Sequence, residues 1–529
     1  MQDKTLMQDA ILEREPGLAP NTNLVPDGRF GFGADMGMGR KQDTRRLSGS
    51  EWTLDDLIAI EQICARHAAN YGLDTFPNQM EVITSEQMLD SYVSAGLPVN
   101  YAHWSFGKHF LIENAKYRSG QNSLAYEIVI NTNPCIAFLM EDNSLAMQTL
   151  VIPHACFGHN SFSKGNYLFR QWTQPDAILD YMLFARNYIA ECEERHGFSR
   201  VEQTLDALHA LRDQGLDKYK RPSKLDSRKE RAEQAKRLFA AQETMRQAEY
   251  YSVVPQAPQS AAKAEQFPLN PEENLLYFLE KHAPKLEPWQ RELARIVRKI
   301  AQYFYPQRQT QVMNEGWATF WHHRLINDMY DAGQIDQGIL LECLHSHTNV
   351  IRQREYSNLN PYALGFAAWN EIKRVCENPT DEDREHLPGI AGKDWLETFH
   401  DTMHNYRDES FILQFMTPKL VRDFKLMNLL TGEGLDHWTV TATAGSASFK
   451  EIRSHLAAAY RLESSIPEIS AVRYARDSDR KLVLHHQSYD GKVLMKAQAE
   501  QTLKQLRMLW GFDVSLESVD QDGNTVKAY

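Results

Sequence analysis

Two segments of the sequence carry the side chains best suited to metal chemistry. The segment PHACFGHNSF contains His154 and His159, and the segment NEGWATFWHH contains Glu315, His322 and His323. Imidazole and carboxylate groups form the ligand set of hydrolytic zinc sites. The two segments together therefore predict a site for zinc or another divalent metal, provided that the fold brings them together.

The spacing of the first pair differs from that of ordinary helical zinc sites. Zinc peptidases of the HExxH type place two histidines four residues apart with a glutamate after the first. Here the histidines are five residues apart and Ala155 occupies the glutamate position. On an ideal α-helix the pair would point ~140° apart. A π-bulge, or a helix that ends at Gly158, would bring the two rings together.

The second segment places its polar groups on one helical face. Glu315 and His322 are seven residues apart, so they return to the same face within ~20°. The phrase Asn-Glu-Gly-Trp-Ala is similar to the motif that supplies the third ligand in many zinc peptidases. We expect His154, His159 and Glu315 to be ligands, and His322 or His347 to be a fourth ligand or a partner behind the ligands. The alternative is a set of buried, hydrogen-bonded helix residues.

Further polar residues are candidates for supporting roles. Because Ala155 cannot act as a base, we expect Glu141 to be the general base. In HWSFGKH, His103 and Lys108 could hold an anionic group of the substrate, or form part of a half-buried aromatic turn. In LHSHTNV, His345 and His347 would share one side of a strand or loop but would diverge on a helix.

Hydrophobic periodicity indicates an α+β fold that is mostly helical. Thr53, with Asp56 three residues later, predicts the start of a helix. Residues 126–130 indicate a short strand, and 135–140 a strand or a helix. Residues 176–195 have helical spacing, and 272–335 indicate two helices separated by Pro306. After Asp436, alternating strands and two helices at 449–460 and 496–509 indicate a small α+β region that closes with a strand at 513–517.

These patterns divide the chain into three parts. Residues 1–48 are rich in glycine and proline and predict a disordered tail. Residues 49–431 form the mainly helical core, interrupted at 218–271 by a charged helical stretch and a proline-rich linker. Residues 432–529 form the C-terminal α+β domain.

Composition excludes several classes of function. The 529 residues carry 58 Lys and Arg against 70 Asp and Glu, a net charge of −12 that does not favour nucleic acid. The apolar runs are too short for a membrane helix, and without a secretion signal we expect a cytoplasmic protein. The six cysteines lack CxxC spacing, which indicates reduced buried thiols. Neither a phosphate-binding GxxxxGK[ST] loop nor a GxSxG elbow occurs.

Longer motifs give the sequence a family resemblance. From about residue 50 to 518 it resembles the SpoVR family, named for stage V sporulation protein R, in segments that include YAHWSFGKHF, LAYEIVINTNPCIAFLMEDNSLAMQTLVIPHACFGHNSF, QVMNEGWATFWHH, LHSHTNVI, NPYALGF and LWGFDVSL. The candidate ligands lie within these segments, as do His103, Lys108, Glu127, Asn131, Asn133, Glu141 and Gln148, and Asn166 follows four residues after the second segment.

The resemblance implies a physiological setting and no particular reaction. It implies a role in spore cortex formation or in stress and stationary-phase programmes, with an AAA+-type serine kinase and a von Willebrand-like domain protein as partners. We carry two hypotheses. The first is a metal-dependent, hydrolase-like enzyme acting on a small or peptide-like substrate. The second is a non-enzymatic regulatory scaffold that binds partner proteins such as the kinase.

Overall fold

A computed structural model of the chain describes most of the predicted core. The described residues are 46–88, 127–218, 270–354, 358–426, 446–461, 466–475, 478–489 and 491–529, with short pieces at 101, 103, 236, 239, 267–268, 428–430 and 439–442. The expected tail, apart from residues 46–48, lies outside the described residues. So does nearly all of the charged stretch and linker expected at 218–271.

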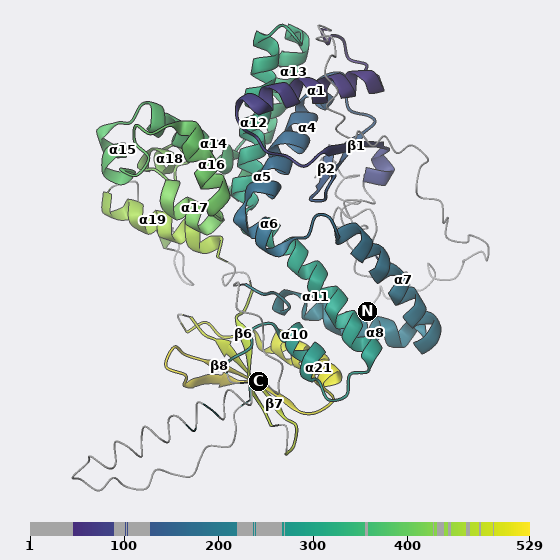
Figure 1. Ribbon diagram of the computed structural model, residues 1–529. Coiled ribbons are helices and arrows are strands. Elements are labelled where there is room, and N and C mark those ends of the chain that lie inside the picture. The colour runs from purple at the N-terminus through teal and green to yellow at the C-terminus, as the bar shows by residue number, and fades with distance from the viewer. Residues whose placement is uncertain are drawn as a thin grey trace, which may run out of the picture.

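The architecture is α+β and mostly helical, as predicted (Figure 1). The N-terminal half contains these elements: α1 (Leu54–Asn70), β1 (Asn78–Ile83), β2 (Glu127–Ile130), β3 (Cys135–Met140), α4 (Leu145–Ile152), η1 (Pro153–His159), α5 (Asn160–Gly165), α6 (Tyr167–Trp172), α7 (Ile178–His196), α8 (Phe198–Ala210) and η2 (Arg212–Gln214).

The second half begins with helices and ends in strands. Its elements are α10 (Leu275–His282), α11 (Pro288–Gln309), α12 (Gln311–Asp331), α13 (Gln337–Val350), α14 (Pro361–Glu377), α15 (Asp381–His386), α16 (Trp395–Asn405), α17 (Asp408–Phe415), α18 (Pro418–Asp423), β4 (Asn428–Leu430), β5 (Thr439–Ala442), α19 (Ser446–Ala459), β6 (Ile469–Tyr474), β7 (Leu482–Gln487), α21 (Lys496–Trp510), β8 (Val514–Val519) and β9 (Thr525–Ala528).

Local sequence signals explain several element boundaries. The Thr53 side chain accepts a hydrogen bond from the backbone N–H of Asp56, and the Asp56 carboxylate accepts one from Thr53, which forms the capping box at α1. Pro306 lies inside α11, in its last turns, and the break before α12 comes at Thr310. The sequence placed this break four residues too early, because a proline near a helix end displaces few hydrogen bonds.

A three-stranded sheet lies beside the helical core. Its order is β1-β3-β2, with β1 parallel and β2 antiparallel to the central strand β3. All six residues of β3 are buried, which explains why its sequence is continuously apolar. Because such a run has no alternation, the sequence alone could not distinguish a strand from a helix here. The Glu127 position opposes Leu139, so the start of β2 lies beside the end of β3.

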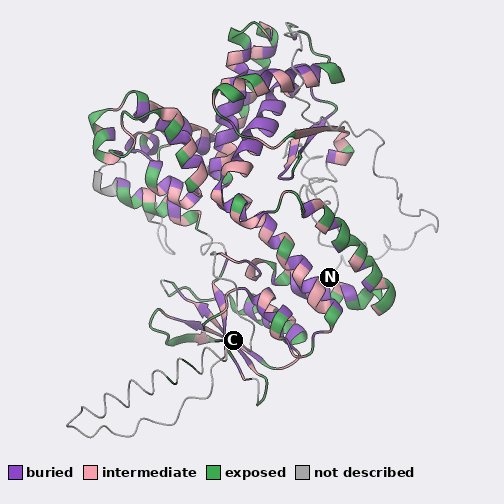
Figure 2. Ribbon diagram, viewed as in Figure 1, coloured by how far each residue is buried: buried purple, intermediate pink, exposed green. Residues whose placement is uncertain are grey.

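The main hydrophobic core gathers around α12. This helix packs against η1, α14 and α1 and contributes the fully buried Trp317 and Trp321. The indole of Trp317 donates to the Ser161 hydroxyl at 3.0 Å, so its polar group is satisfied. In Figure 2 buried residues concentrate on α4 and α12, whereas α7 has a largely exposed outer face.

Glycines let α12 approach its neighbours at backbone distance. A Cβ atom on Gly158 of η1 would lie 2.5 Å from the Ala318 Cα atom. A Cβ on Gly365 of α14 would lie 2.2 Å from the Val312 carbonyl oxygen. No side chain fits at either position, so both contacts require glycine. These contacts bring η1 and α12 together although they are about 160 residues apart in sequence.

The C-terminal sheet has the order β6-β7-β8-β9. Strands β7 and β8 are parallel and connected through α21, whereas the outer pairs are antiparallel. The predicted strands at β6, β7 and β8 and the helix α21 are confirmed, and β9 was not predicted. The other helix predicted for this region, at 449–460, is α19. It packs against α17, and its Phe449 belongs to the main core. The division into domains stays a prediction.

A second feature of the helical body is a buried ion network. The Arg374 guanidinium makes two bonds of 2.8 Å to Asp383 and two of 2.8 Å to Glu371. The Thr417 hydroxyl donates to Glu371 at 2.7 Å, and the Thr380 hydroxyl donates to Asp383 at 2.6 Å. The network joins α14 to α15 and to the start of α18, and every carboxylate oxygen in it accepts a hydrogen bond.

The cysteine and membrane expectations can also be compared with the structure. All six cysteines are free and buried, as predicted. Among the described residues, no helix is both long enough and apolar enough to cross a membrane.

Candidate metal centre

A π-helix presents the first two candidate ligands. Residues 153–159 form the π-helix η1, in which the backbone N–H of Asn160 bonds to the carbonyl of Ala155. Because a π-turn repeats over five residues, side chains five apart lie one above the other. The rings of His154 and His159 have centroids 4.6 Å apart. The predicted π-bulge is therefore present, and the irregular spacing of the pair is explained.

Helix α12 and strand β2 bring carboxylates to these rings. The Glu315 Oε2 atom lies 3.5 Å from His159 Nε2 and 3.9 Å from His154 Nε2. The Glu127 Oε1 atom lies 3.3 Å from His154 Nε2. Ligand atoms of Glu127, His154 and His159 all lie within 4.8 Å of one another. Four possible ligands from three elements therefore surround one small volume, which we call the His/Glu cluster.

The far nitrogen of each ring is held by a neighbour. His159 Nδ1 lies 3.0 Å from the Asn314 side-chain oxygen, which can only accept, so His159 carries its proton on Nδ1. When the ring is neutral, Nε2 therefore offers its lone pair toward Glu315. Such a partner behind the ring is the usual arrangement for a histidine that binds metal.

His154 is held by two further histidines in series. Its Nδ1 lies 2.8 Å from His322 Nδ1, and His322 Nε2 lies 2.8 Å from His347 Nδ1. All three rings are buried. Each pair can share one proton, so the chain of rings is fully bonded when all three are neutral. The Ala318 carbonyl also accepts a hydrogen bond from the His154 ring.

The cluster leaves some buried oxygen atoms without partners. Glu315 Oε2 and Glu127 Oε2 are buried and accept no hydrogen bond. The Tyr362 side chain hydrogen-bonds to the Glu315 carboxylate. Unsatisfied buried acceptors are rare in native proteins and require an explanation. A cation between Glu315 and the two histidines would satisfy them.

Burial and like charges control the ionisation of the cluster. Burial, reinforced by the Glu315 charge, raises the pKa of Glu127 well above its ordinary value. Burial raises the pKa of Glu315, although His159 and Tyr362 oppose this. Burial and the neighbouring His159 lower the pKa of His154 well below its usual range, and burial lowers that of His347 to about 4. Both effects favour neutral groups, as expected for charges removed from water.

Not all of the predicted site residues join the cluster. Glu141 is exposed in the turn after β3, and no described interaction links its side chain to the cluster. His103 lies elsewhere, with its Nε2 3.1 Å from Asp206 of α8 and its ring stacked on His209. Lys108 lies outside the described residues.

The helical context also separates the LHSHTNV pair. His347 and His345 both lie on α13, which makes them diverge. His347 is buried at the end of the histidine chain, whereas His345 is exposed and bonds to Asn349.

Three contributors to the site had no role in the sequence-based prediction. They are Asn314, Tyr362 and, as a member of the cluster, Glu127. Each lies in or beside a segment that carried the family resemblance: Asn314 precedes Glu315, Tyr362 belongs to NPYALGF and Glu127 to LAYEIVINTNP. Their position in these segments was the signal in the sequence that marked them as functional candidates. What they contact is shown only by the packing of β2 and α14 beside η1 and α12.

Fold and site together define a mainly helical protein with a histidine–carboxylate cluster between a π-helix and its neighbouring helix. The SpoVR like protein family model matches residues 51–465, and the SpoVR-like C-terminal domain model matches residues 467–521. The chain belongs to the SpoVR family. It is 49% identical over 491 residues to a protein of Escherichia coli (strain K12) named uncharacterized protein YcgB, covering 91% of this chain and 96% of the relative. No solved structure matches the chain.

Proposed function

We propose that the chain is a metal-dependent, hydrolase-like enzyme whose His/Glu cluster binds one divalent metal ion, with zinc as the first candidate. The observation that carries the proposal is the pair His159 Nε2 and Glu315 Oε2. Both atoms are acceptors and they face each other at 3.5 Å, while Glu315 Oε2 has no hydrogen-bond donor. When His159 is neutral and Glu315 is ionised, two acceptors in this arrangement repel unless a proton or a metal cation lies between them.

Each residue has a defined part in this proposal. His154, His159 and Glu315 bind the metal, which gives the two-histidine, one-carboxylate set found in many catalytic zinc sites. Asn314 and Tyr362 fix the orientation of His159 and Glu315. His322 and His347 hold the His154 ring from behind, so they are positioning residues rather than additional ligands.

Glu127 replaces Glu141 as the carboxylate that we assign to proton transfer. Its Oε1 atom faces His154, and its Oε2 atom has no partner. A bound divalent metal would lower the pKa of a water molecule toward neutrality. Glu127 would accept the proton of that water and return it to the leaving group. We place this activity in the cytoplasm, in the sporulation or stress physiology that the family resemblance implies.

The alternative hypothesis, a scaffold, predicts a sealed cluster in which every polar group has a partner. The paired rings of His322 and His347 fit that description. The two orphaned carboxylate oxygens do not, and the side chains of Glu127, His159 and Glu315 keep exposed fractions of 18%, 14% and 21%. The cluster is therefore not fully sealed, which favours the enzyme.

Metal content tests the proposal directly. The full chain is stripped with chelator, reloaded with zinc, manganese or iron(II), and measured by mass spectrometry. We expect about one metal per chain, and loss of that metal in His159→Ala and Glu315→Gln. His345→Ala is the matched control, because His345 is an exposed histidine that bonds only within α13. Equal metal content in all four proteins, or none in the folded wild type, would refute the site.

The reaction class needs a second measurement. A panel of peptide and ester substrates is incubated with the metal-loaded protein. Hydrolysis that is abolished by chelator and by Glu127→Gln, while Glu127→Gln retains most of its metal, supports the assigned roles. Hydrolysis that survives in Glu127→Gln would remove Glu127 as the base and leave only the metal site.

A further inference from the structure

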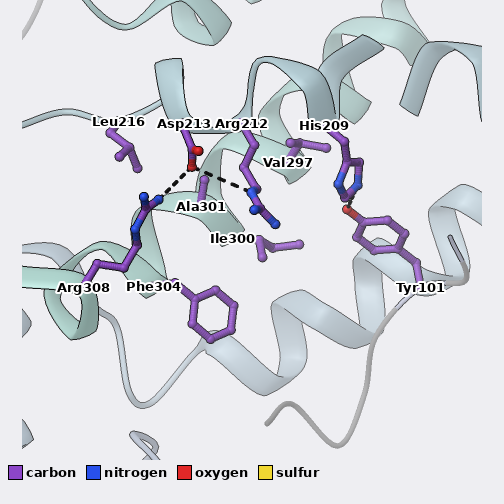
Figure 3. A pocket seen from close by; sticks show the side chains of 10 residues that line it. All are labelled: Tyr101, His209, Arg212, Asp213, Leu216, Val297, Ile300, Ala301, Phe304 and Arg308. Atoms are coloured by element: carbon purple, nitrogen blue, oxygen red, sulfur yellow. Dashed lines mark hydrogen bonds and ion pairs between the residues drawn. The ribbon is translucent and has the colours of Figure 1, made fainter. Parts of the chain in front are cut away.

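A separate cavity lies between α8, η2 and α11. Its volume is about 250 Å³, slightly below the ~300–1,000 Å³ of pockets for drug-sized ligands, which limits it to a small molecule. Figure 3 shows the side chains that line it. The described lining residues are Tyr101, His209, Arg212, Asp213, Leu216, Val297, Ile300, Ala301, Phe304 and Arg308.

One wall of this cavity is an apolar stripe of α11. Val297, Ile300, Ala301 and Phe304 follow one another at intervals of three, one and three residues, so they share one helical face. Leu216, after η2, extends this apolar surface. The stripe offers a surface for a hydrocarbon chain or an aromatic ring.

The charged part of the lining consists of Arg212 and Asp213 of η2 and Arg308 near the end of α11. Arg308 Nη1 bonds to Asp213 Oδ1 at 2.7 Å, whereas Arg212 Nε lies 3.9 Å from the same oxygen. The second distance is too long for a hydrogen bond. Both guanidiniums are thus paired with the single Asp213 carboxylate, Arg308 by a hydrogen bond and Arg212 by a longer ion pair, which leaves a net charge of +1 on these three groups. Among the described residues, the Arg212 guanidinium makes no hydrogen bond, and Figure 3 shows it between Asp213 and His209.

The remaining polar pair contributes no charge. The Tyr101 hydroxyl lies 2.6 Å from His209 Nε2, so the two groups are bonded to each other. Burial, followed by the neighbouring His103 and Arg212, lowers the pKa of His209 to about 3, so its ring is neutral near pH 7. The described lining thus carries a net charge of +1 beside an apolar floor, and Arg212 is the guanidinium that has no hydrogen-bonded carboxylate.

We propose that this cavity binds a small monocarboxylate with an apolar alkyl or aryl body. The carboxylate would lie on the Arg212 guanidinium, which can make two parallel hydrogen bonds to it. The body would lie on the apolar face of α11. A single available charge matches a monoanion better than a phosphate dianion, for which one guanidinium is insufficient. The site shares no residue with the His/Glu cluster and does not depend on it.

Three ligands of the same size test the charge requirement. Hexanoate, hexylamine and 1-hexanol are titrated into the full chain, and binding is followed by calorimetry and ligand-observed NMR. We expect saturable binding of one hexanoate per chain, with the amine at least about tenfold weaker, because it places a cation beside Arg212. Equal binding of the three ligands, or no saturable binding of hexanoate to the folded chain, would overturn the proposal.

Variants locate the binding site. Arg212→Gln should weaken hexanoate by about tenfold or more, whereas Arg195→Gln, on the exposed face of α7, should leave it unchanged. Ala301→Leu should weaken all binding by filling the cavity. Circular dichroism and metal content, which should match the wild type in each variant, show that the fold and the His/Glu cluster are intact. Unchanged hexanoate affinity in both Arg212→Gln and Ala301→Leu would contradict the assignment.

Discussion

The helical body contains two buried polar clusters that differ in one respect. In the Arg374 network, two carboxylates face one guanidinium and every oxygen is hydrogen-bonded. In the His/Glu cluster, Glu127 and Glu315 face histidine rings rather than a guanidinium, and one oxygen of each has no hydrogen-bond partner. The Arg374 network joins α14 to the adjacent α15 and to the start of α18, whereas the His/Glu cluster joins η1 to α12, about 160 residues later. The first holds its own countercharge and is complete. The His/Glu cluster lacks an internal countercharge, and we infer that it binds a cation.

Removing the internal cation from the complete cluster should have the largest effect. Arg374→Ala leaves Asp383 and Glu371 buried without their countercharge, so we expect a loss of about 3–5 kcal/mol in the free energy of unfolding. Urea denaturation followed by circular dichroism measures it. Arg422→Ala is the control, because its partner Glu382 lies on the same helix α15 but the pair is exposed, and it should cost less than about 1 kcal/mol. Similar losses in both variants would show that the network is not special.

Lowering the pH should also destabilise the Arg374 network, by a smaller free energy than the loss of Arg374. Burial favours a raised pKa for Asp383, but the bonds from Arg374 and Thr380 outweigh it and lower the pKa to about 2. The unfolded chain binds this proton near pH ~4, so the stabilisation is complete above that pH and is lost as the pH falls toward 2. We expect Asp383 to contribute about 2 kcal/mol to the acid dependence.

The measurement compares unfolding free energies at pH 5 and pH 3 for the wild type and Asp383→Asn. The wild type should lose more stability between these two values than the variant does, because the variant has no carboxyl group to protonate at this position. Parallel losses in the two proteins would mean that Asp383 does not have a depressed pKa.

Removing a carboxylate from the His/Glu cluster should instead increase the free energy of unfolding. In metal-free protein, Glu127→Gln removes a buried carboxylate that has an unpartnered oxygen and a like charge nearby. We expect a gain of up to about 1 kcal/mol in the free energy of unfolding, because that desolvation and repulsion are relieved. Thermal unfolding of the chelated proteins measures the change. A loss comparable to that of Arg374→Ala would show that Glu127 belongs to a satisfied structural network.

Much of this arrangement could be predicted from local patterns. The cap at Thr53, the strands 126–130 and 513–517 and the shared face of Glu315 and His322 follow from short-range spacing. The five-residue separation of His154 and His159 even indicated the π-turn. The role of Glu127 could not be predicted, because it depends on β2 beginning beside η1, and no local pattern encodes that contact. For the same reason Glu141 was chosen as the base.

The wide turn of η1 has a consequence for how such a site could arise or disappear. An α-turn becomes a π-turn when one additional residue is accommodated within it, so the two imidazoles converge because of the number of residues between Pro153 and Asn160. Removing one of the four residues between the two histidines would restore an α-turn and leave the rings four residues apart, the spacing that places both on one face of an α-helix. A pair of histidines spaced four apart could therefore acquire the π-turn by a single insertion, and lose it by a single deletion, with both rings kept on one face and no ligand changed.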